Sequence, residues 1–432
     1  MSPAPPLSVV GIGADGWDGL PAAAQRDLCA AEVLIGGPRQ LALLPARCAG
    51  ERIPWPKPLR PGVPGLLAAH AGRRICVLAS GDPMFHGIGR TLNELSGQEG
   101  GDPEAGMPPL RVRPHPSSVS YACARLGWPV EDTEVITLVG RPADTLAAAL
   151  HAGRRLLVLS AGAATPDEVA ALLRARGFGP TRMRVLEQLG GERERMSGGT
   201  AATWAEPPGD PLNVIALDCA REPGALRLSA VPGLPDAAYA HDGQLTKRHV
   251  RAATLAALAP APGELLWDIG GGSGSIAIEW LRAHRSCRAI GVERDPVRAE
   301  RIGHNARTLG VPSLRVVQGA APAALDGLPV PDAVFIGGGL TAPGLLDACW
   351  DALPPGGRIV ANTVTLESEA LLADHYRRHG GELVRLAVSH ATPVGGFTGW
   401  RQAMPVTQWA AVKPASPAPP PSSPLPLETD ER

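Results

Sequence analysis

The stretch of residues 264–279 constrains the fold of this chain more than any other part of the sequence. Residues 264–269 form a short apolar run, Glu-Leu-Leu-Trp-Asp-Ile, which predicts a buried parallel strand. Five residues rich in glycine follow, and residues 275–283 then show helical periodicity, with Glu279 and Arg282 expected to face water. A strand, a glycine turn and a helix in this order form the first unit of a nucleotide-binding α/β domain, because glycines let a ligand approach the backbone closely.

The next strand indicates which nucleotide this unit binds. Residues 288–293 predict a second buried strand that ends in Glu293, about 20 residues after the turn, where a ribose-binding carboxylate is expected. This spacing fits NAD as well as S-adenosylmethionine. Two details favour S-adenosylmethionine. Asp268, just before the glycines, can face the cationic methionine end of that cofactor, and the turn is Gly-x-Gly-x-Gly, not the Gly-x-Gly-x-x-Gly that cradles a pyrophosphate.

Length and composition limit the remaining possibilities. A chain of 432 residues is too long for one ordinary core, so two domains are expected. The formal net charge of −1 gives no general attraction to nucleic acid or anionic membranes, and no apolar run is long enough to span a bilayer. The seven cysteines form no Cys-x-x-Cys pair or zinc-type cluster, so no metal site is predicted. With no signal-peptide pattern at the N-terminus, reduced thiols and a cytoplasmic location are expected.

The first half of the chain alternates strands and helices from its start. Strands are predicted at residues 7–12, 32–35, 74–79 and 110–114, and helices at residues 21–31, 87–95 and 116–126. This alternation predicts a mainly parallel sheet that binds ligands outside the carboxyl ends of its strands. The proline-rich residues 54–64 are expected to form an exposed connection, and Ser117 or Ser118 to cap a helix. A second small α/β lobe, opening with a helix at residues 143–151, is expected to follow.

Three loops of this half carry a specific resemblance. Val9-Val-Gly-Ile-Gly13, Ser80-Gly-Asp-Pro83 and His115-Pro-Ser-Ser-Val-Ser120 resemble the signature loops of the tetrapyrrole (corrin/porphyrin) methylases, over roughly residues 7–220. Members of that family bind S-adenosylmethionine in a cleft between two α/β lobes. The resemblance implies that the cofactor contacts are Gly11, Gly13, Gly81, Asp82, Ser117 and Ser118. His115 departs from the glycine or small residue that is more usual there. Such a histidine can act as a base, but more often it packs or forms hydrogen bonds in a loop.

The second half continues the nucleotide-binding domain after a linker-like stretch rich in proline and glycine. Thr246 is expected to cap a helix at residues 247–258, with Lys247, Arg248 and Arg251 either at one end of a ligand cleft or on a solvated basic face. The remaining elements occur in the order of the Rossmann-like methyltransferases: a helix at residues 296–309 and strands at residues 314–318, 333–336 and 357–362.

Four segments of this half extend the resemblance. Leu245-Thr-Lys247, Trp267-Asp-Ile-Gly-Gly-Gly-Ser-Gly274, Phe335-Ile-Gly-Gly-Gly339 and Ala361-Asn-Thr-Val-Thr-Leu-Glu367 together resemble the decarboxylating precorrin methyltransferases of cobalamin biosynthesis, over roughly residues 240–412. The resemblance implies cofactor contacts from Thr246, Asp268, Gly270, Gly272, Gly274, Glu293, Gly319, Ala320 and Gly337. Many relatives have an aspartate at the position of Ala320, so a backbone group would have to meet the adenine amino group here.

The two resemblances together predict the organisation and activity of the chain. The expected α/β protein has a two-lobed tetrapyrrole-methylase domain (residues 1–220), a linker (221–239), a Rossmann-like domain (240–412) and a disordered tail (413–432). A fusion in this order resembles the bifunctional precorrin methyltransferases. That implies methylation of precorrin-6B at C5 by the first domain and at C15 by the second, with decarboxylation of the C12 acetate, giving precorrin-8.

The substrate implied by this resemblance bears many carboxylates, which arginine and lysine hold as charge-assisted pairs. The candidates are Lys247, Arg248, Arg401, Arg39 and Arg141. Two alternatives stay open. Tetrapyrrole-methylase folds also serve RNA and protein methyltransferases, although this chain lacks a basic, aromatic-rich patch. The first half could also bind a tetrapyrrole without methylating it. Both domain families commonly assemble, so a homo-oligomer is expected.

Overall fold

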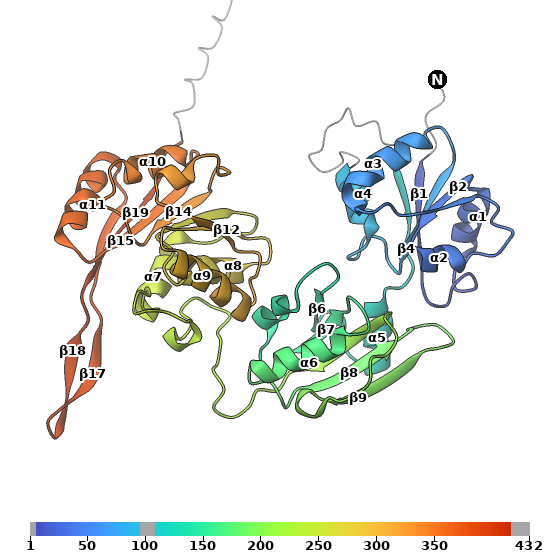
Figure 1. Ribbon diagram of the computed structural model, residues 1–432, viewed down its shortest axis with the longest axis horizontal. Coiled ribbons are helices and arrows are strands. Elements are labelled where there is room, and N and C mark those ends of the chain that lie inside the picture. Colours follow the sequence, from blue (N-terminus) through green and yellow to red (C-terminus); the bar gives the residue numbers. More distant parts are fainter. Residues whose placement is uncertain (1–5, 96–108, 416–432) are drawn as a thin grey trace, which may run out of the picture. The chain divides into compact units, whose positions relative to one another are not determined.

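The computed structural model describes residues 6–95 and 109–415, which form two compact α/β units (Figure 1). Unit 1 comprises Met1–Ala143 and Leu150–Ala225, and unit 2 comprises Asp144–Ala149 and Leu226–Arg432. Both units contain a sheet covered by helices, which confirms the expected two-domain α/β fold class. Within the described ranges, no helix is long and apolar enough to cross a membrane.

The first lobe of unit 1 is a five-stranded parallel sheet with strand order β3-β2-β4-β1-β5. The strands are β1 (Leu7–Ile12), β2 (Val33–Gly36), β3 (Glu51–Pro54), β4 (Ile75–Ser80) and β5 (Leu110–Arg113). The helices are α1 (Ala22–Ala30), α2 (Pro38–Ala42), α3 (Leu59–Ala69) and α4 (Ile88–Leu95). Successive residues of β1 enter two different cores, one shared with α1 and α2 and the other with α3 and α4. Helices on both faces explain why the central strands are continuous apolar runs.

The prediction of an exposed connection at residues 54–64 is wrong in its second part. From Leu59 onwards these residues belong to α3, although they include two prolines. Pro61 lies in the first turn of the helix, where a backbone N–H would have no partner within the helix. Val63 and Leu67 are buried against the sheet, and this burial outweighs the preference of a proline-rich segment for a loop.

The second lobe of unit 1 is a five-stranded mixed sheet with strand order β6-β7-β10-β8-β9. Its strands are β6 (Thr133–Thr137), β7 (Arg155–Leu159), β8 (Arg182–Glu187), β9 (Arg195–Thr200) and β10 (Asn213–Asp218). Its helices are α5 (Ser118–Leu126), α6 (Thr165–Ala175) and the short 3₁₀ helix Ala201–Thr203. Two strands, β6 and β9, were not predicted. Both lie at sheet edges, where a strand needs no strong apolar pattern. The helix expected at residues 143–151 is a 3₁₀ helix, Ala143–Ala149, of which all but the first residue belong to unit 2.

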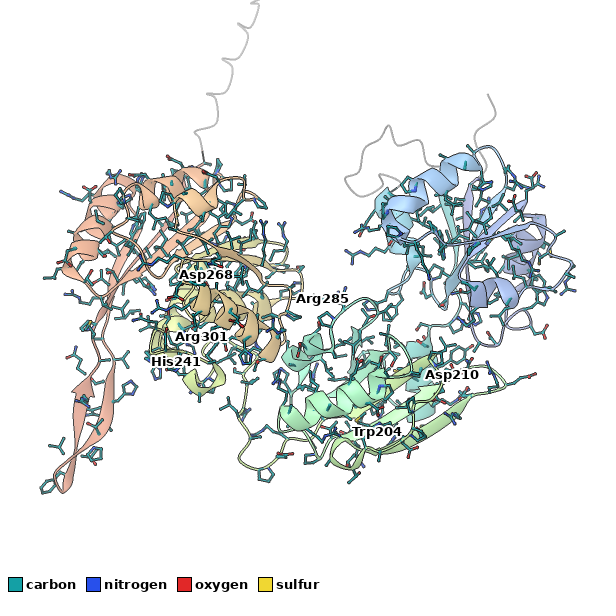
Figure 2. All side chains as sticks on the ribbon, viewed as in Figure 1. Trp204, Asp210, His241, Asp268, Arg285 and Arg301 are labelled. Carbon is teal, nitrogen blue, oxygen red and sulfur yellow. The ribbon has the colours of Figure 1, made fainter. Side chains whose placement is uncertain are left out.

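Unit 2 contains a seven-stranded sheet with strand order β13-β12-β11-β14-β15-β19-β16. Its strands are β11 (Leu265–Ile269), β12 (Arg288–Glu293), β13 (Arg315–Gln318), β14 (Ala333–Ile336), β15 (Arg358–Thr363), β16 (Glu382–Leu386) and β19 (Val406–Val412). Its helices are α7 (Arg248–Leu258), α8 (Ser275–Ala283), α9 (Pro296–Thr308), α10 (Leu345–Ala352), α11 (Leu366–His379) and the 3₁₀ helices Asp236–Ala238 and Ala323–Leu325. The strand order reverses between β11 and β14, and Asp268 is the penultimate residue of β11 (Figure 2).

Helices cover both faces of this sheet. One core joins the strands to α7, α8 and α9, and the other joins them to α10 and α11. Leu266 of β11 enters the first core, while Leu265 and Trp267 enter the second. This alternation fixes the register of β11, because a shift by one residue would exchange the two faces.

Two features at the end of unit 2 were not expected. β17 (Ser389–Val394) and β18 (Phe397–Gln402) form a two-stranded hairpin that extends from the sheet, with Phe397 84% exposed (Figure 1). The predicted tail lies mostly in residues 416–432, which are outside the described residues. Lys413 was counted in that tail but is held in place next to the sheet. Its Nζ donates to the carbonyl groups of Trp350, Asp351 and Leu353 at the end of α10.

Candidate functional site

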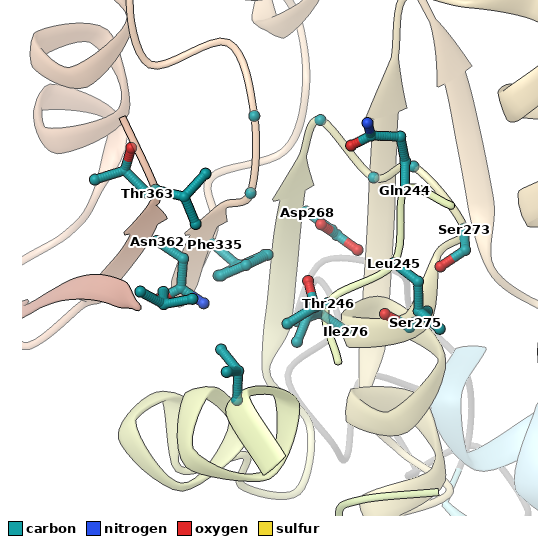
Figure 3. Close-up of a pocket in the computed structure, with 18 of the residues that line it drawn as sticks. Gln244, Leu245, Thr246, Asp268, Ser273, Ser275, Ile276, Phe335, Asn362 and Thr363 are labelled. Carbon is teal, nitrogen blue, oxygen red and sulfur yellow. The ribbon is translucent and has the colours of Figure 1, made fainter. Parts of the chain in front are cut away.

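A cavity of about 1160 Å³ lies in unit 2 at the carboxyl ends of β11 and β14 (Figure 3). This is the point where the strand order of the sheet reverses, which is where open α/β sheets bind their ligands. Its volume exceeds the roughly 300–1,000 Å³ that is usual for a pocket holding one drug-sized ligand. The cavity therefore has room for a nucleotide-sized molecule and part of a second, larger one.

The cavity collects predicted residues from separate parts of the sequence. Those that line it are Thr246, Lys247, Arg248, Asp268, Gly270, Gly272, Glu293, Gly319, Ala320 and Gly337. Gly274 and Arg401 are not among its lining residues. Gly274 precedes α8, and a Cβ on it would lie 2.8 Å from Cγ2 of Ile302, so close packing explains the glycine. Arg401 lies on the β17–β18 hairpin, directly opposite His390, which does line the cavity.

The glycine loop after β11 is shaped by a close backbone approach. Gly270 has a φ of +70°, and a Cβ there would lie 2.9 Å from backbone atoms of Gly338 in the loop after β14. Gly272 has a φ of +58°, and a Cβ there would lie 3.6 Å from the Gln244 carbonyl oxygen, an ordinary contact, so the backbone conformation explains this glycine. Only glycine adopts both conformations without strain, so this loop can present its backbone directly to the cavity.

Asp268 is a buried carboxylate with an unused oxygen. It is 1% exposed, and its Oδ2 accepts a hydrogen bond of 3.0 Å from the Ala277 backbone N–H. Oδ1 has no hydrogen-bond partner among the described residues, and the same is true of the buried Ser273 Oγ, another lining atom. Burial raises the pKa of Asp268 to about 7. A buried oxygen without a partner is costly, so the site suits a ligand that brings a cation or an N–H group.

Glu293 has the position expected for a ribose-binding carboxylate, at the end of β12. It is buried, and its Oε2 accepts from the Gly272 N–H at 2.9 Å while Oε1 accepts from the Asp295 N–H at 3.0 Å. These bonds fix the carboxylate beside the glycine loop. Each oxygen of a carboxylate has a second acceptor position, which leaves Glu293 able to accept from ligand hydroxyl groups.

A polar network that the sequence did not predict holds Asn362, which lines another part of the cavity. Asn362, at the end of β15, donates from Nδ2 to Thr254 Oγ1 at 2.8 Å. Gln408 donates from Nε2 to the same Thr254 Oγ1 at 3.1 Å and to Asn362 Oδ1 at 2.8 Å. Because Thr254 uses its own hydrogen on the Val250 carbonyl, both amides must point their NH₂ groups at it, and Asn362 is held in one orientation. The available signal was a polar residue at the carboxyl end of a predicted strand.

Basic side chains gather at the first turn of α7 and on the facing hairpin. Lys247, Arg248 and His249 line the cavity from α7, and His390 lines it from β17. The ring centroids of His249 and His390 lie 6.0 Å apart. The lining of the cavity thus includes buried carboxylates, which suit a cation, and basic side chains, which suit an anion.

Glu279 and Arg282 of α8 do not face water as predicted. Glu279 is 4% exposed, and Arg282 is half-buried, with Nη1 donating to the Leu309 carbonyl at 2.6 Å. The apolar pattern of the helix could not show this burial, because residues 233–239, which are distant in the sequence, cover that side of α8.

The prediction that Thr246 caps α7 is also wrong. So is the prediction that Arg251 lies at a ligand cleft or on a solvated basic face. The N-cap residue of α7 is Lys247, and no side chain caps the helix. The Thr246 carbonyl instead accepts from Nη1 of Arg251 at 2.5 Å. Arg251 is fully buried, so it belongs neither to a solvated basic face nor to the ligand-facing cations.

In unit 1 the three signature loops meet. A Cβ on Gly11 would lie 1.9 Å from the Gly81 carbonyl oxygen and 2.9 Å from the His115 backbone nitrogen. Gly81 has a φ of +58°, and its own Cβ would lie 3.2 Å from Cα of Ser117. A Cβ on Gly13 would lie 2.7 Å from Nε2 of His115. The end of β1 and the loops after β4 and β5 are therefore in backbone contact, and Gly11 and Gly81 permit it.

The polar residues of these loops mainly order their own backbone. Asp82 Oδ1 accepts from the Met84 N–H at 2.9 Å, which shapes the turn after β4. Ser117 is the N-cap of α5, and its Oγ accepts from the Ser120 N–H at 3.1 Å. Ser118 is the first residue of that helix. Of the two serines expected as a possible cap, the structure selects Ser117.

His115 is buried beside an acid in the same loop cluster. It is 4% exposed, and its Nε2 lies 3.1 Å from Asp15 Oδ1 without hydrogen-bond geometry. Tyr121 donates to Asp15 Oδ2 at 3.4 Å, and burial together with the Asp15 charge raises the pKa of Tyr121. Of the two possibilities for His115, this burial agrees with packing inside the loop cluster.

The two cationic candidates of unit 1 have different surroundings. Arg39, on α2, donates from Nη2 to Ser80 Oγ at 3.1 Å, which places it beside the loop after β4. Burial lowers its pKa, and the Asp210 charge partly opposes this effect. Arg141 is exposed in the turn that follows β6. Among the described residues, no group of three or more side chains has the arrangement of a metal site.

Comparisons with known proteins agree with this geometry. Residues 237–413 match the family model of the precorrin methyltransferase domain, and residues 6–205 match that of the tetrapyrrole (corrin/porphyrin) methylases. A precorrin-6Y C(5,15)-methyltransferase (decarboxylating) of Sinorhizobium sp is 48% identical over 410 residues, covering 95% of this chain and 97% of that protein.

Two relatives of half the size each match part of the chain. A cobalt-precorrin-7 C(5)-methyltransferase of Salmonella typhimurium is 36% identical over 193 residues, covering 44% of this chain and 88% of that protein. A probable cobalt-precorrin-6B C(15)-methyltransferase (decarboxylating) of Pyrobaculum aerophilum is 32% identical over 176 residues, covering 39% of this chain and 90% of that protein.

Proposed function

Since the chain belongs to the precorrin-6Y C(5,15)-methyltransferases (decarboxylating), which use S-adenosylmethionine in cobalamin biosynthesis, we propose that its two units divide the reaction. Unit 1 methylates C5 of precorrin-6B, and unit 2 methylates C15 and decarboxylates the C12 acetate, which gives precorrin-8. The observation that carries this division is that residues 6–205 and 237–413 match separate methylase families.

The residues of the unit 2 cavity fit S-adenosylmethionine. The unused Asp268 Oδ1 suits the cationic methionine end, and Glu293 suits the ribose hydroxyls. Gly270, Gly272, Gly319, Ala320, Gly337 and Thr246 form the surrounding wall. The bound cofactor supplies a methyl group activated on a sulfonium. The chain supplies orientation and water exclusion, and fixing two reactants in this way can contribute on the order of 7–11 kcal/mol.

In unit 1 we propose that the loop cluster holds a second S-adenosylmethionine. Gly11, Gly13 and Gly81 bring the three loops together, and Asp82, Ser117 and Ser118 line the turns that they form. The contacts are supported by the adjacency of the loops, since ligands of parallel α/β sheets bind beyond the carboxyl ends of β1, β4 and β5.

The substrate carboxylates are proposed to bind basic side chains of each unit. In unit 2 these cations are Lys247 and Arg248, with Arg401 opposite His390 on the hairpin. In unit 1 they are Arg39, beside the loop after β4, and Arg141. The electrons released by decarboxylation pass into the conjugated macrocycle. The protein contributes by placing cations away from the carboxylate that is lost and by excluding water from it.

The test is anaerobic incubation of the full chain with S-adenosylmethionine and precorrin-6B, followed by mass spectrometry of the product. We expect a gain of two methyl groups and the loss of carbon dioxide. One methyl group with decarboxylation would leave unit 2 active and reduce unit 1 to a binding module. An unchanged substrate would contradict the proposed activity of both units.

We also propose that the protein is a cytoplasmic homo-oligomer that acts on a small molecule and not on nucleic acid. The seven cysteines are all free, as expected where thiols stay reduced, and the net charge of −1 offers little attraction to a polyanion. Light scattering after size exclusion measures the oligomer, and a mobility shift with RNA tests the last point. A monomer would contradict the proposed homo-oligomer. A stable RNA complex would contradict the proposal that the protein does not act on nucleic acid.

A further inference from the structure

One wall of the unit 2 cavity is made by the segment that leads into α7. This segment, residues 233–247, is called the strap below. Its residues Pro235, Asp236 and Ala237 and residues 243–247 line the cavity. The first seven residues of the strap fall within the linker predicted from the sequence, so part of that linker is a wall of the site.

The beginning of the strap is held by the buried carboxylate of Glu279. Its Oε2 accepts from the Gly233 N–H at 2.6 Å, and its Oε1 accepts from the Leu234 N–H at 3.1 Å. The Tyr239 hydroxyl also donates to Oε1, at 2.8 Å. One side chain of α8 therefore satisfies two backbone donors and a hydroxyl of the strap.

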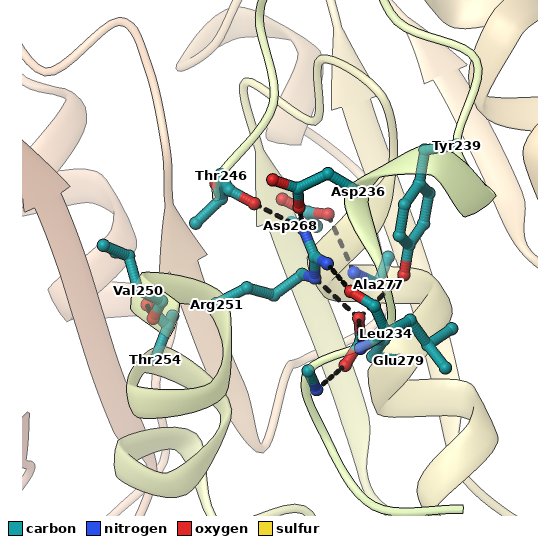
Figure 4. Close-up of polar contacts among 11 residues, drawn as sticks. Leu234, Asp236, Tyr239, Thr246, Val250, Arg251, Thr254, Asp268, Ala277 and Glu279 are labelled. Carbon is teal, nitrogen blue, oxygen red and sulfur yellow. Dashed lines mark hydrogen bonds and ion pairs between the residues drawn. The ribbon is translucent and has the colours of Figure 1, made fainter. Parts of the chain in front are cut away.

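The buried Arg251 of α7 contacts both ends of the strap (Figure 4). Its Nε donates to Glu279 Oε1 at 2.6 Å, and its Nη2 donates to the Leu234 carbonyl. Its Nη1 donates to Asp236 Oδ1 at 3.1 Å and to the Thr246 carbonyl at 2.5 Å. The planar guanidinium uses several donors at fixed angles, so the beginning and end of the strap are fixed relative to each other.

The middle of the strap is joined to the glycine loop. Asn305 of α9 accepts from the Ala240 N–H at 2.9 Å, and its Nδ2 donates to the Ala240 carbonyl at 2.9 Å and to the Ser273 carbonyl at 2.8 Å. Asp242 forms ion pairs of 2.9 Å with two arginines of the same helix. A movement of the strap would thus disturb the loop that faces the cavity.

A buried ion pair is weak evidence for stability, because desolvation offsets most of its attraction, but it fixes the geometry of the groups around it. We propose that Arg251 is a positioning residue for the unit 2 cavity. Acting with Glu279, it holds the strap against the glycine loop, and cofactor binding in this cavity requires that position. The inference rests on the proposed S-adenosylmethionine site, and it assigns residues 233–239 to the methyltransferase and not to a passive linker.

The experiment uses the full chain and its R251K variant, which keeps the positive charge and loses the guanidinium fork. Hydrogen exchange without ligand is expected to be faster by about tenfold in the strap of R251K and unchanged in β11 and β14. We expect the strap to be out of place in about nine tenths of R251K chains, against about one tenth of parent chains. Because the apparent affinity scales with the fraction of chains whose strap is in place, the concentration of S-adenosylmethionine needed to protect the glycine loop then also rises about tenfold. Arg285→Lys makes the same change at an exposed arginine of unit 2 and is expected to alter neither quantity (Figure 2).

The Tyr239→Phe variant keeps the ion pair and removes one bond to Glu279. It is expected to show smaller changes in the same two measurements, including where R251K fails to fold. The inference is overturned if strap exchange is unchanged in a folded R251K, or if faster strap exchange leaves the cofactor affinity unaltered. If the parent chain shows no cofactor-dependent protection of the glycine loop, the proposed site fails, while exchange without ligand still reports whether Arg251 holds the strap.

Discussion

The two units are proposed to bind the same cofactor with different kinds of contact. In unit 2, two buried carboxylates, Asp268 and Glu293, stand at adjacent strand ends beside the glycine loop. In unit 1, the loops touch each other through backbone atoms, with Gly11 against Gly81 and His115. The proposed unit 2 site thus relies on charge, and the proposed unit 1 site relies on how closely three segments of backbone approach one another.

The two proposed sites imply that one ligand does not require one recognition chemistry. Where the cofactor meets a strand end that is buried in a sheet, a single unpaired carboxylate oxygen can select its cation. Where it meets turns, close backbone approach limits the shape of the site instead. Unit 2 should therefore respond most to changes of charge, and unit 1 to changes of volume.

The largest effect is expected from adding one methyl group to unit 1. In Gly11→Ala the new Cβ would overlap the Gly81 carbonyl oxygen, which is backbone and cannot rotate away. Overpacking costs about 1–3 kcal/mol and sometimes more. We expect the C5 methyl group to be missing from the product mass, with decarboxylation retained. Gly65→Ala is the matched control, because nothing lies within 4 Å of its added Cβ. A G11A chain that still adds two methyl groups would contradict the steric account of unit 1.

The next largest effect is expected from removing one charge in unit 2 without a change of size. Asp268→Asn loses the carboxylate that suits the cationic end of the cofactor. Hydrogen bonds to charged groups contribute about 1.5–3 kcal/mol, so affinity should fall by about 10- to 150-fold. Titration calorimetry of the full chain should then show one strong site in place of two. Asp326→Asn, at an exposed aspartate of the same unit, should keep both. Equal affinity in D268N would remove charge as the distinguishing feature of unit 2.

The pH dependence offers a third distinction between the sites. Burial raises the pKa of Asp268 to about 7, and a cationic ligand binds the ionised form, so affinity at unit 2 should rise with pH and level off above about 7. Because the folded state holds this proton to higher pH than the unfolded state does, the free energy of unfolding should also fall as pH rises from about 4 to 7. Calorimetry across this pH range measures both the cofactor affinity and the free energy of unfolding. If the rise of affinity with pH, or the fall of the free energy of unfolding with pH, persists unchanged in D268N, that pH dependence belongs to another titrating group.

The comparison also shows what the sequence could and could not predict. The strand, glycine loop and helix of residues 264–283 were predicted because apolar runs and glycine spacing are local patterns. The burial of Glu279 was not, because its hydrogen-bond partners lie 28 to 46 positions earlier in the chain. Arg251 was predicted to lie either at one end of a ligand cleft or on a solvated basic face, yet it is fully buried and its guanidinium contacts the strap.

Segments without a strong pattern were missed for a related reason. The β17–β18 hairpin is exposed on both faces, so it lacks the alternation by which a half-buried strand is predicted. Asn362 lay inside a quoted motif, but its partners Thr254 and Gln408 come from α7 and β19, which no local pattern connects. Tertiary contacts create these features.

The smallest effect is expected from that network, and it tests whether charge alone governs unit 2. In Thr254→Val, Asn362 loses the acceptor that fixes its amide, while the carboxylates of the cavity stay in place. One neutral hydrogen bond contributes about 1 kcal/mol, so kcat for carbon dioxide release should fall about fivefold with the affinity for S-adenosylmethionine unchanged. Thr254→Ser keeps the hydroxyl and should restore kcat, which a general loss of packing would not allow. T254V could instead weaken cofactor binding as strongly as D268N does. In that case the orientation of Asn362 and the charge of Asp268 are coupled, and unit 2 differs from unit 1 in its whole polar network and not in charge alone.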